Sequence, residues 1–125
     1  MERERIKRFA IDILGCGCEE SVFESIDVWE DFTLVCGVEL SKKILIGKRL
    51  LIYIADVDKC APDMVAAVIA DGLKERETHC YNRLRLVIVT PGVEKHLLPY
   101  SDAFDRVKGR DDRTHIHIVK EGHAV

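Results

Sequence analysis

The sequence lacks any apolar run approaching the roughly 20 residues that a membrane-spanning helix requires. The opening stretch, MERERIKR, carries charges of both signs and is not followed by a small-residue cleavage site, so no secretory signal is expected. Internal repeats, low-complexity tracts and linkers are also missing from the sequence. These absences predict one domain over residues 1–125, located in the cytoplasm and without a membrane partner.

Motifs that name a reaction are absent as well. Neither G-x-G-x-x-G nor G-x-x-x-x-G-K-[ST] occurs, and Gly47-Lys48 lies in an expected hairpin turn, the wrong context for a phosphate loop. A Ser/His/Asp triad is recognised by geometry and not by sequence order. The sequence therefore leaves open whether the protein is an enzyme.

Basic residues are missing from Phe9 to Ser41, a stretch that holds eight acids and leaves the rest of the chain with a charge of +5. The simpler interpretation is a solvated acidic face, and the functional one is a docking face for a basic partner or a cation. The short basic run from Arg106 to Arg113 is interrupted by aspartates, so no nucleic-acid partner is expected.

The five cysteines form no C-x-x-C pair, and their odd number argues against a complete disulfide framework and fits a reducing compartment. Cys16 and Cys18 form a single C-x-C beside Glu19 and Glu20, whose charges oppose thiolate formation. A divalent metal would reverse that balance. Residues that could complete a metal site are Cys36, Cys60, His79 and Cys80. The alternative is that these small residues fill a tight turn.

The run Leu14-Gly15-Cys16-Gly17-Cys18, followed by Val22-Phe23, resembles an LGC-x-C-P-x-EVF pattern near the N-terminus of small prokaryotic proteins of uncharacterised function. Here Glu19 stands where that pattern often has proline. The resemblance covers about a dozen residues and implies no activity. It implies only that Cys16 and Cys18 belong to a recurring motif.

The central part of the sequence predicts a strand–turn–strand–helix–strand unit. Lys43–Ile46 and Leu50–Ala55 flank the turn at residues 47–49. Pro62–Glu77 has helical spacing, with Val65, Val68, Ile69, Gly72 and Leu73 as its inner stripe. Leu84–Val89 is apolar on both faces, as is typical of a covered parallel strand. The helix and its flanking strands thus form a right-handed βαβ unit.

The remaining elements complete an α/β fold, with α+β as the alternative class. Glu2–Leu14 predicts a helix, although Phe9–Leu14 also alternates like a strand, and Glu19–Ile26 predicts a second helix. Asp27–Leu40 alternates as a strand in which Gly37 marks a bulge or a break, and Trp29 is expected to anchor a helix on the sheet. The last expected elements are helical turns at Val93–Leu98 and Ser101–Val107 and a strand at Thr114–Lys120. We expect a mixed sheet of four to five strands, with the N-terminal helices packed on one face.

The expected carboxyl ends of the two parallel strands are the first place to look for a ligand. Asp56 and Asp58 follow one strand, and Thr90 and Gly92 follow the other. These residues could hold a cation or hydrogen-bond a substrate, and an enzyme acting on a cationic substrate is one interpretation. The alternative is that Asp58 caps a loop or helix and Thr90 begins a turn.

His115 and His117 share one face of the last expected strand, about 6–7 Å apart. They could share a divalent metal only with further ligands from elsewhere, and an exposed sheet edge is the alternative explanation.

These observations favour a small non-enzymatic binding or accessory domain with a protein or small-molecule ligand, and with a sheet edge that could form a homodimer. The rival is a thiol-dependent metal-binding or redox protein acting through Cys16 and Cys18.

Overall fold

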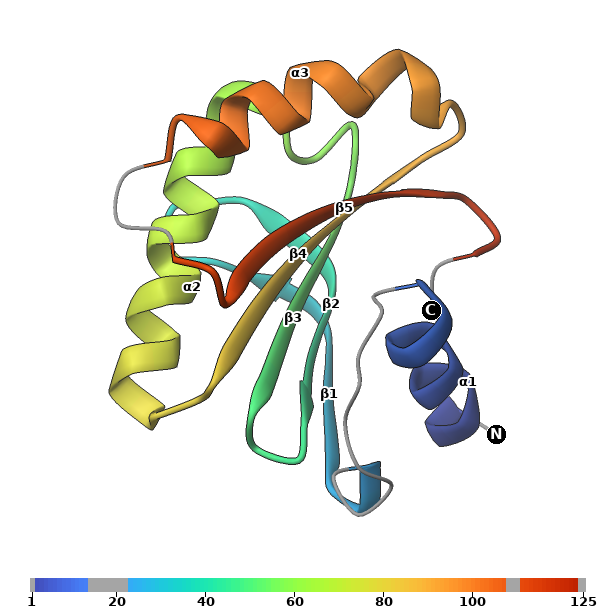
Figure 1. The fold of residues 1–125 in the computed structure, drawn as a ribbon, viewed down its shortest axis with the longest axis vertical. Coiled ribbons are helices and arrows are strands. Elements are labelled where there is room, and N and C mark those ends of the chain that lie inside the picture. Colours follow the sequence, from blue (N-terminus) through green and yellow to red (C-terminus); the bar gives the residue numbers. More distant parts are fainter. Residues whose placement is uncertain (1, 14–22, 108–110, 124–125) are drawn as a thin grey trace.

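The computed structural model describes residues 2–13, 23–107 and 111–123 (Figure 1). The chain begins with helix α1 (Glu2–Arg8), which continues as the π-helical turn η1 (Phe9–Ile13). The helical prediction is therefore confirmed over these residues, and the strand alternative for Phe9–Leu14 is wrong there. Most of the predicted helix Glu19–Ile26 lies outside the described residues, and Ile26 is already the first residue of a strand. Within the described ranges, no helix is long and apolar enough to cross a membrane.

One five-stranded mixed sheet organises the chain, in the order β1-β2-β3-β4-β5. Strands β1 (Ile26–Thr33), β2 (Glu39–Ile46) and β3 (Leu50–Asp56) form an antiparallel meander. Strands β4 (Arg83–Thr90) and β5 (Thr114–Lys120) extend it in parallel beyond β3. The predicted α/β class, the hairpin and the parallel βαβ unit are all confirmed.

Two helical crossovers produce the parallel pairs. The first, between β3 and β4, contains the short helix η3 (Pro62–Met64) and helix α2 (Val65–His79), close to the predicted Pro62–Glu77. The second is helix α3 (Val93–Asp105), which runs through Pro99 without a break. The prediction of two helices, Val93–Leu98 and Ser101–Val107, is therefore wrong.

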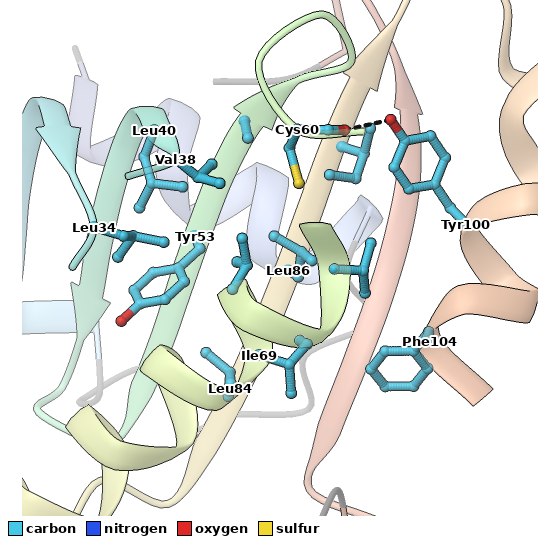
Figure 2. Packing of buried hydrophobic residues seen from close by; sticks show 14 of the residues in the cluster. Leu34, Val38, Leu40, Tyr53, Cys60, Ile69, Leu84, Leu86, Tyr100 and Phe104 are labelled. Atoms are coloured by element: carbon cyan, nitrogen blue, oxygen red, sulfur yellow. Dashed lines mark hydrogen bonds between the residues drawn. The ribbon is translucent and has the colours of Figure 1, made fainter. Parts of the chain in front are cut away.

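Proline removes only one backbone donor from a helix, and burial of α3 offsets that loss. Tyr100 and Phe104 lie one turn apart and are both buried. The Tyr100 hydroxyl also donates a hydrogen bond to the Cys60 carbonyl, which ties α3 to the loop before α2 (Figure 2).

Each face of the sheet carries its own apolar core. On β3, Leu51, Tyr53 and Ala55 face α2 and α3, whereas Leu50, Ile52 and Ile54 face α1 and η1. Figure 2 shows the first core, in which Ile69 of α2 lies over the sheet near Leu84 and Leu86. The second core is closed by Ile6, Phe9 and Ala10. The N-terminal helical segment thus covers one face, as predicted.

Asp27–Leu40 is not one continuous strand, because a turn separates β1 from β2, and the break predicted at Gly37 is confirmed. The Leu34 amide donates to the Val38 carbonyl at 2.9 Å, and Gly37 adopts a φ of +97°. Leu34 and Val38 are buried beneath the turn, so the apolar alternation continues through it and imitates a longer strand. Val35, at the tip, is 97% exposed.

Trp29 does not anchor a helix, contrary to the prediction. It lies on the edge strand β1, is 39% exposed, and its ring lies 4.5 Å from the Lys43 ammonium group. Its partner is therefore a neighbouring strand, and the contact is a cation–π interaction.

Candidate functional site

A buried ion pair fastens α2 to the antiparallel part of the sheet. Trp29, Lys43 and Tyr53 stand side by side on β1, β2 and β3, because each pairs with the next in the strand register. From α2, the Glu75 carboxylate accepts hydrogen bonds from Lys43 Nζ and from the Tyr53 hydroxyl, both at 2.6 Å. Burial, followed by this bond to Glu75, raises the pKa of Tyr53 well above its usual range, so Tyr53 is a fixed donor.

Aromatic rings enclose the cation of this pair. Lys43 Nζ lies 4.3 Å from the Phe32 ring centre and 4.5 Å from that of Trp29, and only 9% of the Lys43 side chain is exposed. Two rings and one carboxylate therefore replace most of the water around the ammonium group. The same contacts hold Phe32 and Glu75 in fixed positions.

A groove of about 290 Å³ lies beside this ion pair, between the β1–β2 turn and α2. We call it the α2 groove. Its apolar side comes from Phe32, Leu34 and Val35, and its polar side includes Asp71, Lys74 and Glu75 of α2. The Asp71 Oδ2 atom accepts the Cys36 amide at 2.9 Å, which fixes the turn to the helix.

The chemistry of the α2 groove is that of an apolar slot with carboxylate acceptors. Each carboxylate oxygen has two lone pairs, so Asp71 and Glu75 can accept further bonds in addition to those they already make. An apolar cavity with a few fixed polar groups is the usual form of a small-molecule site. The site thus suits a ligand with an apolar body and a donor group, such as an amine.

Two of the four residues predicted at the strand ends take part in turns. Asp56 and Asp58 are exposed, and the Asp56 carbonyl accepts the amides of Lys59 and Cys60 in a turn. Thr90 is fully buried, and its Oγ1 accepts the Gly92 amide at 3.1 Å. The Thr90 bond matches the alternative in which Thr90 begins a turn. A capping role for Asp58 and ligand binding by these four residues stay predictions.

Gly92, one of these four residues, lines a pocket. That pocket lies at the carboxyl ends of β4 and β5, where its other lining residues are Pro91, Val93, Glu94, Lys95 and Lys120. Its lining residues belong to the turn after β4, the start of α3 and the end of β5.

Cys16 and Cys18 lie outside the described residues, so their metal or redox role stays a prediction. Of the candidates to complete that site, Cys60 is buried, whereas Cys36 and Cys80 are exposed. Burial raises the pKa of the Cys60 thiol to about 11, which makes it an inert packing residue. Among the residues that the structure describes, no group of three His, Cys, Asp or Glu side chains could hold a metal ion.

No family model matches this sequence, and no match was found among curated proteins or solved structures.

His115 and His117 lie on one face of β5, as the alternation predicts, and the structure adds Arg85 from β4 beside them. The His115 ring donates from Nε2 to the Asp112 carbonyl at 2.9 Å, because a carbonyl can only accept. The His117 Nε2 atom lies 3.4 Å from an Arg85 guanidinium nitrogen, so it accepts and the ring is neutral. Burial, then the charges of Arg85 and His115, lowers the pKa of His117 to about 4.

The low pKa of His117 predicts a loss of stability in mild acid. The unfolded chain takes up a proton near pH 6.5 and the folded chain only near pH 4, so stability falls as pH drops through that window. We expect a contribution of about 1–2 kcal/mol, reduced by the partial exposure of the ring. His117→Gln should remove this part of the pH dependence in urea unfolding between pH 7 and 4.5, whereas the exposed control His123→Gln should retain it. A pH profile unchanged by His117→Gln would contradict the assignment.

The sequence contains signals for the α2 groove that alternation alone does not reveal. Lys43 is a charged residue directly before the apolar run Ile44–Ile46, and Glu75 falls on the buried side of an amphipathic helix. A buried cation and a buried acid in elements that cross each other suggest an ion pair. The groove itself depends on the β1–β2 turn, for which Gly37 is the sequence signal although the apolar alternation continues through it.

Proposed function

We propose that this protein is a small non-enzymatic binding domain that takes a small ligand with an apolar body and an amine group in the α2 groove. The observation that carries the proposal is that Asp71 and Glu75 line the same cavity as the apolar residues Phe32, Leu34 and Val35. The wall and the carboxylates come from segments about 40 residues apart in the chain and are held together by the Lys43–Glu75 ion pair.

Benzylamine is the simplest probe of this chemistry, because it joins one apolar ring to one cation. We expect about millimolar affinity, as is usual for so small a ligand. In a ¹H–¹⁵N spectrum of the whole chain, benzylamine should shift the amides of residues 32–36 and 71–79. Benzoate, which has the same ring and the opposite charge, should leave them unchanged.

Two matched variants distinguish binding in the α2 groove from nonspecific attraction of benzylamine to any acidic residue. Asp71→Asn should weaken benzylamine binding about fivefold to tenfold, because a charged acceptor is replaced by a neutral one of the same shape. Asp63→Asn removes an exposed acid at the start of the α2 segment and should have no effect. Equal binding of benzoate and benzylamine, or equal affinity in Asp71→Asn, would rule out the proposed ligand class.

We further propose a cytoplasmic location and self-association through a sheet edge. The odd cysteine count supports the first proposal. For the second, Asp27, Glu30 and Asp31 are exposed on the edge strand β1, so two copies of β1 would bring like charges together. The edge formed by β5 is therefore the better candidate.

A further inference from the structure

Arg85 is a buried cation on the face of the sheet opposite the α2 groove. It lies on β4 between Leu84 and Leu86, which pack in the core beneath α2, so strand alternation turns Arg85 to the other face. Only 8% of the residue is exposed. Arginine does not give up its proton in proteins, so this burial places a permanent positive charge in a desolvated position.

The other buried cations of the described chain show what Arg85 lacks. Lys43 pairs with Glu75, and Arg76 makes a two-bond ion pair with Asp111 at 2.7 and 3.1 Å. Arg85 has no carboxylate partner among the described residues, and its Nε atom is buried without any hydrogen-bond partner. A buried charge is normally paired, so the partner of Arg85 is missing from the chain as described.

Three basic side chains lie near Arg85 on this face of β4 and β5. Arg83 lies two residues earlier on the same face and is exposed, and His115 stands opposite Arg85 in the strand register. His117 accepts from the guanidinium group through Nε2, as described above. Burial, and then the charge of Arg83, lowers the pKa of Arg85, which shows that the surroundings disfavour its charge. A metal cation would be repelled here, whereas an anion would relieve the repulsion.

We propose that Arg85, with Arg83, His115 and His117, binds the phosphate group of a small molecule. The guanidinium fork matches two oxygens of a phosphate, and the unpaired Nε–H lies on the edge that such a pairing uses. The second arginine suits the double charge of a phosphate monoester better than the single charge of a carboxylate. This site lies on the opposite face from the α2 groove and does not depend on the function proposed for that groove.

The test is the thermal stability of the whole protein in inorganic phosphate, compared with sodium chloride at equal ionic strength. For a Kd of about 1 mM, phosphate at about 10 mM should raise Tm by roughly 5 °C. Arg85→Met should abolish that increase, and because it removes an unpaired buried charge it should not lower Tm in chloride. Arg106→Gln, which removes an exposed arginine at the end of α3, should keep the full increase.

Three results would overturn the proposal: no stabilisation by phosphate, the same stabilisation in Arg85→Met, or equal stabilisation by acetate. If Arg85→Met does not fold, the imidazole resonances of the unmutated protein provide a second test. Phosphate should shift the imidazole resonances of His115 and His117 and leave those of His79 and His96 unchanged. If all four shift equally or none shifts, the site is refuted.

Discussion

Replacement of Glu75 by glutamine should lower the free energy of unfolding by about 3 kcal/mol, because it removes one partner of a buried ion pair. Glutamine keeps the shape of Glu75 and can still accept from the Tyr53 hydroxyl, so only the charge is lost. Lys43 would then hold its ammonium between two aromatic rings without a counter-charge. Urea unfolding at neutral pH measures the difference.

The control for this variant is Glu77→Gln, an exposed acid two residues further along α2. Its effect should stay within about 0.5 kcal/mol, as is usual for surface substitutions. The double variant Lys43→Met, Glu75→Gln should recover much of the loss, because it removes both charges and keeps an acceptor for the Tyr53 hydroxyl. If Glu75→Gln were as stable as Glu77→Gln, the ion pair would not fasten α2 to the sheet.

Replacement of Gly72 by valine should cost about 3 kcal/mol, for a different reason. A Cβ atom at Gly72 would lie 2.6 Å from a Leu84 methyl carbon and 3.1 Å from a Tyr53 ring carbon. Glycine here lets α2 approach β3 and β4 closely, and that approach also sets the position of Glu75. A branched side chain would force the helix away from a fully buried leucine.

Ala70→Val provides the matched control, because Ala70 is exposed on the same helix. That change carries only the helix-propensity cost of a β-branched residue, about 0.5 kcal/mol. Gly72→Ala should fall between the two, since its better helix propensity offsets part of the clash with the flexible end of Leu84. If thermal or urea unfolding showed that Gly72→Val and Ala70→Val lose the same stability, the close packing of α2 on the sheet would be contradicted.

The core of this fold could be predicted from local patterns. β3 and most of β4 are apolar, and α2 has a clear inner stripe that includes Gly72, so the parallel pair followed from sequence alone. Prediction failed where tertiary contacts override a local signal. Pro99 suggested a helix end, but the buried pair Tyr100 and Phe104 keeps α3 continuous.

The candidate sites depended even more on tertiary structure. Alternation correctly placed His115 and His117 on one face, but Arg85 reaches them from a strand about 30 residues earlier. In the same way, Lys43 and Glu75 are 32 residues apart and meet only because α2 crosses the meander. Such pairings need the strand order, and the β1–β2 turn that completes the α2 groove was hidden by the buried Leu34 and Val38.

A crystal structure of the protein soaked with benzylamine tests most directly whether the α2 groove is a ligand site. We predict electron density for the ring against Phe32 and Leu34, with the amine within hydrogen-bond distance, about 3 Å, of the Asp71 or Glu75 carboxylate. A groove that remains empty while benzylamine binds elsewhere, or a ring bound with its amine pointing away from both carboxylates, would contradict the account.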